Sequence, residues 1–397
     1  MTPPAHDFER SGPARLKHHI IPLAMFFGTF SWSFVYVSLP FYIGTISDGD
    51  PASTLRWTGW ILGISPLVTV VTAPLWGRYA ETRRPRQLYV TVQAFQGAAF
   101  FGTAVVTTLP GLFLSRLVMG LMGASSTFAY MMAGRSGDAF TVRRQVAAVQ
   151  SGMTIGQVIG PLAGAVVAAR IGFRPSFVLG GVILLGCAAL VGWLAPESTQ
   201  GGAQTDRRSG VRAAELVTVG IIVLGANIHV FFLPAILPQV LASLGVAPAA
   251  TLEVGGLVIF ASGIAAALGA MLTPRLGDLG SDRLVIAGLL TGSSLCLAAL
   301  AVPGSVWGYG ALRFLQILCI TPVFPLVVAR IAQHGSGQVI GVINSARIGA
   351  GFLGPVATTT MLAWAPATAV YLILAAIGLG CVPLALAGQR SRRGVFS

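Results

Sequence analysis

The sequence predicts an all-α integral membrane protein whose twelve transmembrane helices form two six-helix bundles, with both chain termini in the cytoplasm. Of the 397 residues, 54% are hydrophobic and only 9% are charged, whereas about a quarter of the residues in an ordinary soluble domain carry charge. The chain divides into twelve apolar stretches, most of them about 20 residues long, the length that crosses a bilayer as a helix. Lysine and arginine are concentrated in every second connection between these stretches.

The first six spans are expected between a basic tail at 1–18 and residue 194. The first apolar run continues to Ile43, which is too long for the core of a cleaved signal peptide. The later runs are separated by short connections that are basic or rich in glycine and proline. These six spans, which together form an N-terminal bundle at 19–194, are predicted at 19–44, 57–76, 88–109, 111–133, 147–169 and 175–194.

A polar segment at 195–212 separates the two halves of the chain. Its glycine, glutamine, serine and charged residues are typical of a flexible linker. A C-terminal bundle at 213–388 and a cytoplasmic tail at 389–397 follow. The spans of this bundle are predicted at 213–240, 253–272, 284–302, 307–329, 340–364 and 367–387.

The distribution of positive charge orients the spans. All but six of the 25 lysines and arginines lie in the tails and in the connections that follow even-numbered spans. Three of the exceptions are in the opposite connections and three are within spans: Arg56, Arg170, Arg174, Arg116, Arg313 and Arg347. Positively charged connections stay in the cytoplasm, so both termini are expected there. The net charge of +13 therefore reflects membrane topology, and no nucleic-acid partner is expected.

The two halves repeat one another at an offset near 195 residues. "SGMTIGQVIGPLAG" at 151–164 matches "SARIGAGFLGPVAT" at 345–358, and Arg116 matches Arg313. Two parallel repeats of six spans place the substrate site between the halves, near the middle of the membrane.

Three motifs resemble those of the major facilitator superfamily. They are "GRYAETRRPR" at 77–86, "RLVMGLMGA" at 116–124 and "GQVIGPLAG" at 156–164. The last resembles a motif of exporting, antiporter branches, so the resemblance implies a twelve-span drug:proton antiporter, a branch that includes multidrug and siderophore exporters. The chain departs from the family pattern at Tyr79, Glu81, Arg84 and Met119.

The first and third motifs are candidate gating elements. Glu81, in a loop with Gly77, Arg84 and Arg86, is expected to pair with arginines when the cytoplasmic side closes, and Asp278 is its counterpart in the second half. The alternative is a loop whose charge only sets topology.

Gly156, Gly160 and Gly164 share one helix face, and Pro161 frees the carbonyl of Gln157. We expect this kinked face to pack closely on span 8 and seal one side of the cavity, with Gly354 and Pro355 as the equivalents in span 11. Generic tight packing is the alternative.

Charged residues within spans usually mark a site or a buried pair. Arg116 and Arg347 are therefore expected to line the substrate cavity, together with Asn344, which shares a helix face with Arg347, while Arg313 either lines it or extends to the membrane surface. Trp32 and Tyr36 lie four residues apart and either line the cavity together or face lipid. No Asp or Glu lies in the middle of a span, so the cavity should favour anionic or neutral, oxygen-rich substrates.

A proton-coupling residue is harder to identify. His229 lies within a span, and histidine changes charge near neutral pH, although a lone histidine is more often a packing residue. Glu253 and Glu81 are the alternatives.

Together these features predict a secondary exporter of a small organic molecule, coupled to protons and located in the bacterial inner membrane. An importer on the same fold and a non-transporting membrane protein remain open. The sequence contains no HExxH, GxSxG or Walker A motif, so no enzyme, cofactor or metal site is expected. The expected partners are the substrate, protons and lipid, and we expect a monomer.

Overall fold

The computed structural model describes residues 12–134, 139–195, 213–278, 281–332 and 337–387, and within these ranges the regular structure is entirely helical. The tail at 389–397 and nearly all of the linker at 195–212 lie outside them. The helices, which include the short 3₁₀-helix η1, are α1 (Gly12–Ile46), α2 (Pro51–Thr82), α3 (Pro85–Val105), α4 (Leu109–Leu121), α5 (Ser125–Gly134), α6 (Ala139–Ile171), α7 (Phe173–Leu194), α8 (Ala213–Phe231), α9 (Leu233–Ser243), η1 (Pro248–Ala250), α10 (Thr251–Gly277), α11 (Asp282–Ala299), α12 (Val306–Ile320), α13 (Val323–Ala332), α14 (Gly337–Leu362) and α15 (Ala367–Ala387).

The predicted all-α membrane fold is confirmed. Among the described residues, ten helical segments are long and apolar enough to cross a membrane. Two further long helices, α3 and α14, occupy the predicted third and eleventh spans. Both carry more polar residues, including Gln93 and Gln96 in α3 and Arg347 in α14. The count of twelve spans and the cytoplasmic location of the termini stay predictions.

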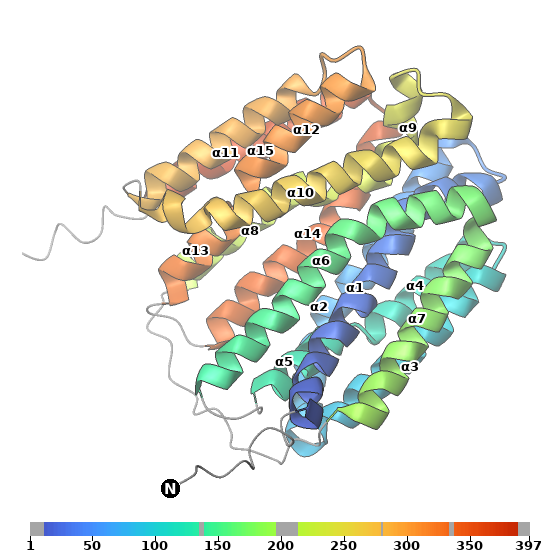
Figure 1. Ribbon diagram of the computed structural model, residues 1–397. Helices are drawn as coiled ribbons and strands as arrows, with labels where there is room; N and C mark the ends of the chain where they lie inside the picture. The colour runs from blue at the N-terminus through green and yellow to red at the C-terminus, as the bar shows by residue number, and fades with distance from the viewer. Residues whose placement is uncertain (1–11, 135–138, 196–212, 279–280, 333–336, 388–397) are drawn as a thin grey trace, which may run out of the picture.

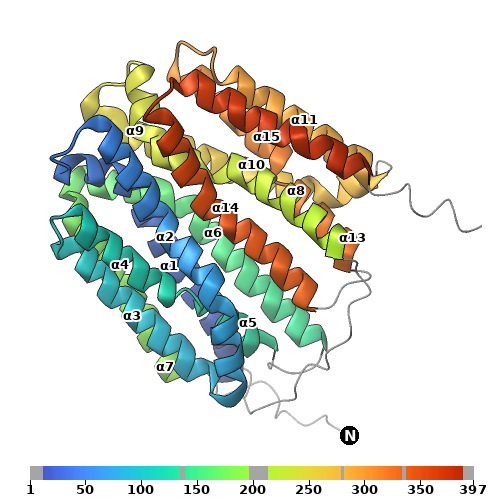
Figure 2. The same ribbon diagram turned by 180° about the vertical axis from the view of Figure 1, so that it is seen from behind.

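The helices form two groups in the order that the repeat predicts. Helices α1–α7 gather on one side of the molecule and α8–α15 on the other (Figures 1 and 2). Within the first group α1 packs on α6, and α3 on α7; within the second, the equivalent helices α8 and α14 pack together, as do α11 and α15. The same contacts therefore recur in the two halves.

Three predicted spans are broken into two helices each. Span 4 breaks between α4 and α5, and its repeat equivalent, span 10, breaks between α12 and α13 at Thr321 and Pro322. Span 7 breaks at Phe232, just before Pro234. Proline cannot donate the backbone hydrogen bond of a continuing helix. The equivalent span 1 stays continuous as α1, although it contains Pro40, so the halves differ here.

The hydrophobic cores show that the bundles meet at one end and separate at the other. We call the end with the connections near 77–87 and 273–283 the basic end, and the end with Arg56, Arg170 and Arg174 the opposite end. At the basic end each bundle has its own core of buried side chains. Toward the opposite end the cores are shared: Val37 lies among side chains of α8–α15, and Ala235 among side chains of α1–α7.

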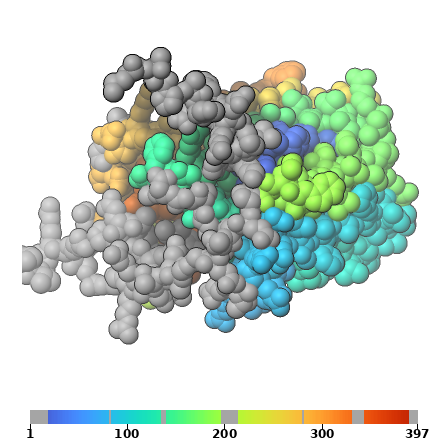
Figure 3. Space-filling view, turned by 60° about the horizontal axis from the view of Figure 1, so that its bottom comes forward, coloured from blue at the N-terminus to red at the C-terminus, as the bar shows by residue number. Residues whose placement is uncertain are grey.

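Figure 3 brings the basic end forward, and the cyan helices of the N-terminal bundle and the yellow and orange helices of the C-terminal bundle occupy different sides of it. Side chains of both bundles pack into common cores only toward the opposite end, so the molecule is closed there.

Candidate functional site: a polar pocket between the bundles

A small pocket of about 170 Å³ lies between the bundles. Its walls come from α1, α2, α3, the break between α4 and α5, and α14: Trp32, Ser65, Pro66, Thr69, Gln96, Gly123, Ser125 and Ile348. Apolar walls with a few converging polar groups are typical of a small-molecule site. We therefore take this pocket as the centre of the candidate site.

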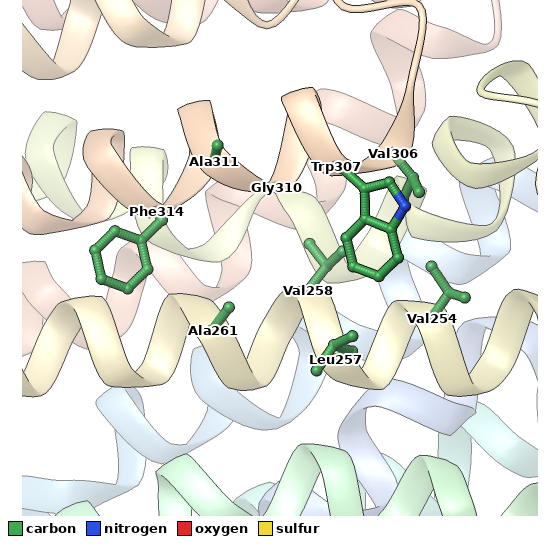
Figure 4. A pocket seen from close by; sticks show the side chains of 9 residues that line it. All are labelled: Val254, Leu257, Val258, Ala261, Val306, Trp307, Gly310, Ala311 and Phe314. Carbon is green, nitrogen blue, oxygen red and sulfur yellow. The ribbon is translucent and has the colours of Figure 1, made fainter.

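A larger cavity of about 370 Å³ lies elsewhere, between α10 and α12. Figure 4 shows that side chains of these two helices line it, including Val258, Trp307 and Phe314. Among the described side chains that line this cavity, the Trp307 indole alone can form a hydrogen bond and none is charged. The cavity also involves only the C-terminal bundle. It therefore lacks the features that fix a ligand's orientation.

The polar side chains of the pocket wall lie beside the break in span 4. Side chains of α2 and α3 donate to backbone carbonyls at and near the break. Ser65 Oγ donates to the carbonyl of Arg116 at 2.5 Å, Thr69 Oγ1 to Gly120 at 3.1 Å, and Gln96 Nε2 to Met122 at 2.5 Å.

Gln96 also orients the predicted site residue Trp32. Its Oε1 atom accepts a hydrogen bond of 3.1 Å from Trp32 Nε1, so the indole is held in the pocket wall. Gly123, in the break, has no room for a side chain, since a Cβ there would overlap the methyl and hydroxyl groups of Thr69. The predicted partner residue Tyr36 lies one turn further along α1, half-buried near Arg116.

Arg347 lies in α14 beside the pocket, next to the wall residue Ile348. Its side chain is exposed, its Nε donates to Asn344 Oδ1 at 3.2 Å, and its guanidinium carbon is 5.1 Å from the centre of the Phe324 ring. Tyr130 of the N-terminal bundle is within electrostatic range of it. Arg347 and Asn344 are thus together, in the space where the two bundles separate.

Arg116 is buried inside the N-terminal bundle, with 2% of its surface exposed. Its Nη1 atom contacts Met119 Sδ at 3.5 Å, whereas its Nε and Nη2 atoms have no hydrogen-bond partner among the described residues. An unpaired buried cation is costly, so this residue is unusual for a purely structural arginine.

Arg313, the repeat equivalent, is equally buried, but both of its Nη atoms are hydrogen-bonded, and only its Nε has no partner among the described residues. Its Nη1 donates to the carbonyl of His229 at 2.7 Å, and its Nη2 to the carbonyl of Val230 at 2.9 Å. Pro234 cannot donate to Val230, so Arg313 satisfies carbonyls that the break in span 7 exposes. This environment separates Arg313 from the pocket and suits a role in holding the broken helix.

A buried chain of hydrogen bonds continues from Arg313. Gln316 Oε1 accepts from Arg313 Nη1 at 2.5 Å, and Gln316 Nε2 donates to Ser293 Oγ at 2.9 Å. His229 Nε2 donates to the carbonyl of Leu374 at 2.8 Å, so its Nδ1 accepts from Ser293 at 3.3 Å. Both ring nitrogens are therefore used, and a second proton on His229 would add charge beside Arg313. The geometry suits the packing role that the sequence left open.

Glu253, the other described coupling candidate, lies at the opposite end. Its Oε1 atom is 3.9 Å from Arg170 Nε; the arginine side chain is mostly exposed and the glutamate side chain is half-buried. The guanidinium carbon of Arg56 lies over the Trp364 ring, 4.8 Å from its centre. Each of these contacts joins α2 or α6 of the first bundle to the second bundle, so both would be lost if the opposite end opened.

The loop at 77–86 is described only in part. The side chain of Glu81 lies outside the described residues, so its expected ion pairs are untested. Arg86 Nη1 donates to the carbonyl of Ala195 at 2.9 Å, which ties the loop to the end of α7. Gly77 lies in the last turns of α2, Arg84 immediately precedes α3, and the exposed Asp278 follows α10.

The glycine stripe of α6 contacts α1, so the expectation that it packs on span 8 is wrong. A Cβ at Gly156 would lie 2.5 Å from the carbonyl oxygen of Phe26, and one at Gly160 would lie 2.8 Å from that of Phe30. A Cβ at Gly164 would overlap the carbonyl oxygen of Phe34. Small residues bring helix backbones together in membranes, and α1 is the neighbour within the same bundle.

Span 8 does meet α6, but through its own glycines. Gly256 of α10 faces Pro161 and Ala165, and Gly263 faces Val158. In the second half, Gly354, next to Pro355, packs on the break between α8 and α9. The kink motif therefore joins span 5 to span 1 and span 11 to span 7.

Residues 22–235 match the family model of the Major Facilitator Superfamily, which is more than half of the chain. The chain belongs to this superfamily. It is 25% identical over 353 residues to the MFS-type transporter YuxJ of Bacillus subtilis (strain 168), covering 84% of this chain and 87% of that protein. It is 29% identical over 357 residues to the multidrug resistance protein MdtG of Dickeya zeae (strain Ech586), covering 82% of each.

Among solved structures, the nucleoside transporter NupG aligns with a TM-score of 0.74 at 14% identity, over 93% of this chain and 98% of that one. This protein is therefore a multi-pass membrane transporter with the fold of the superfamily. Its pocket includes residues that sequence reasoning missed: Ser65, Thr69, Gln96 and Ser125. The sequence did contain a signal for two of these pocket residues: Ser65 and Thr69 are polar residues on the same face of an otherwise apolar helix.

Proposed function

We propose that the protein is a secondary active transporter that exports a small organic molecule across the inner membrane by alternating access. The observation that carries the proposal is the polar pocket between bundles that share cores at one end and have separate cores at the other. Membership of the superfamily and the likeness to multidrug resistance proteins support it. The basic end is then the cytoplasmic side, and the pocket receives its substrate from there.

Outward release requires the two ends to exchange their contacts. The opposite end opens as Arg56 leaves Trp364 and Arg170 leaves Glu253, and the basic end closes over the pocket. An exposed ion pair contributes only about 0.2–1 kcal/mol and an exposed cation–π contact about 0.5–1 kcal/mol, so these contacts can break without a large barrier. The loop at 77–86 and Asp278 supply charges for the closed cytoplasmic side.

The substrate class follows from the charges in the spans. Arginines occur there without acidic residues in mid-span, which favours polar, oxygen-rich or anionic metabolites such as siderophores, as well as neutral drugs. The proton is the proposed coupling ion, on the resemblance to drug:proton antiporters. His229 is poorly placed to carry it, which leaves Glu253 and Glu81.

Transport by purified protein in liposomes tests this function. With inside-out protein, an imposed pH gradient should drive accumulation of labelled substrates, and Ser125→Trp, which fills the pocket, should abolish it while keeping the thermal stability of the parent. Uptake only in the opposite direction would identify an importer and refute export. No counterflow for any candidate from either side would identify a non-transporting membrane protein.

A further inference from the structure

Arg347 differs from the other two arginines of the predicted spans in where its charge lies. Arg116 and Arg313 are buried within single bundles, with 2% and 1% of their surfaces exposed. Arg347 is exposed, although it lies in the middle of α14. One turn toward the opposite end, Gly351 packs against Pro66 of α2, so Arg347 stands where the inter-bundle contact ends and the open space begins.

The neighbours of Arg347 hold the guanidinium in place without neutralising it. Asn344 accepts from Nε, and the ring of Phe324 lies against the guanidinium plane. Within the described residues, Nη1 and Nη2 have no hydrogen-bond partner. These two atoms form the edge that binds a carboxylate or phosphate with two parallel hydrogen bonds.

The facing wall from the other bundle is polar and neutral. Tyr130 of α5 lies within electrostatic range of Arg347 across the space, and its hydroxyl donates to Gln150 of α6. Gln150 in turn reaches Thr154. No carboxylate of the described part of the spans stands near Arg347, so its charge is uncompensated.

We propose that Arg347 is the anion-binding residue of the substrate site, and that the transported molecule is a small organic anion. Its anionic group lies on Nη1 and Nη2 and faces Tyr130, and its apolar or aromatic body extends past Ile348 to Trp32 and Pro66 in the pocket. The anion contacts the C-terminal bundle through Arg347 and the N-terminal bundle through Tyr130, whose hydroxyl proton turns from Gln150 to the anion. The inference rests on the proposed transport function and names its substrate class.

This arrangement also links binding to closure. Closing the basic end would move Arg347 from water against a wall that is polar but carries no negative charge among its described residues, which is unfavourable for an unpaired cation. A bound anion supplies the missing partner and charge-assisted hydrogen bonds. The loaded carrier therefore closes more readily than the empty one, which limits futile cycling.

Binding to the purified full chain in detergent tests the proposal. The probes are matched pairs of aryl carboxylates and their carboxamides, such as 2-naphthoate and 2-naphthamide, with affinity measured by calorimetry. At least one carboxylate should bind at least tenfold more tightly than its amide, and Arg347→Gln should remove that preference. Tyr130→Phe should weaken binding severalfold, whereas Arg275→Gln, at an exposed arginine of the same end, should leave it unchanged.

If no carboxylate in the panel binds more tightly than its amide, or if the preference persists in Arg347→Gln, the inference is overturned. Transport of neutral compounds would then still be open, and the export assay decides it separately. Conversely, an anion preference lost in Arg347→Gln would support the site even if the direction of transport proved to be inward.

Discussion

At the scale of single residues, two arginines at equivalent positions of the repeat have opposite surroundings. Arg313 donates to two backbone carbonyls and to Gln316. In the first half Met119 occupies the position equivalent to Gln316, and α1 is unbroken, so Arg116 lacks these partners. A buried cation is stable only where it is paired and hydrogen-bonded, so the same residue type stabilises one bundle and strains the other.

Replacement of each arginine by methionine should separate the two cases. Arg313→Met leaves the carbonyls of His229 and Val230 unpaired, at a cost of about 1–3 kcal/mol for each buried group, and should lower the thermal unfolding midpoint in detergent by several degrees. Arg116→Met removes an unpaired charge and should leave the midpoint unchanged or raise it. Equal destabilisation by both substitutions would mean that Arg116 has a stabilising partner after all.

At the scale of helices, close packing depends on individual glycines. Gly378 in α15 lies against the buried His229, and a Cβ there would approach Cε1 and Nε2 of the ring and Ser294 Oγ. Gly380, two residues away on the same helix, has no atom within 4 Å of such a Cβ. Together they form a matched pair in which only one position is sterically constrained.

Gly378→Ala should therefore destabilise the protein by about 1–3 kcal/mol, the usual cost of overfilling a packed core, whereas Gly380→Ala should have almost no effect. Thermal unfolding of the two variants, measured side by side, checks this. If the two midpoints were equal, α15 would have room to move away from His229, and the hydrogen bond from His229 to Leu374 would not be a fixed element of the bundle.

The helices were largely predictable from sequence, but their breaks and the pocket were not. Apolar runs and arginine-rich connections depend on local composition, so each predicted span coincides with a helix or a broken pair of helices, although α2 (Pro51–Thr82) and α6 (Ala139–Ile171) extend well beyond the predicted 57–76 and 147–169. At the break in span 4, Ser65, Thr69 and Gln96 reach backbone carbonyls from other helices, and such contacts cannot be read from local composition. Likewise Trp32 and Arg347 were predictable as polar or aromatic residues in spans, but Tyr130 was not, because its importance comes from facing Arg347 across the bundles.

At the scale of the whole molecule, contact between α2 and α14 keeps the opposite end closed. A Cβ at Gly59 would overlap Thr359 Oγ1 and lie 3.0 Å from the carbonyl oxygen of Pro355. Trp60 packs on Phe352, with ring centres 5.5 Å apart. These contacts join the two bundles, so bulk at Gly59 acts on the equilibrium between states and not on the core of either bundle.

Gly59→Leu should therefore shift the population toward the state that is open at the opposite end, because only that state has room for the new side chain. Spin labels at Asp48→Cys and Val302→Cys, both exposed positions at this end, should move apart in a background without Cys187, Cys296, Cys319 and Cys381. Gly186→Leu, where a Cβ meets nothing within 4 Å, should leave the label distance unchanged. An unchanged distance in folded Gly59→Leu protein would mean that α2 and α14 are not the moving contact, and that the bundles pivot about α6 and α10 instead.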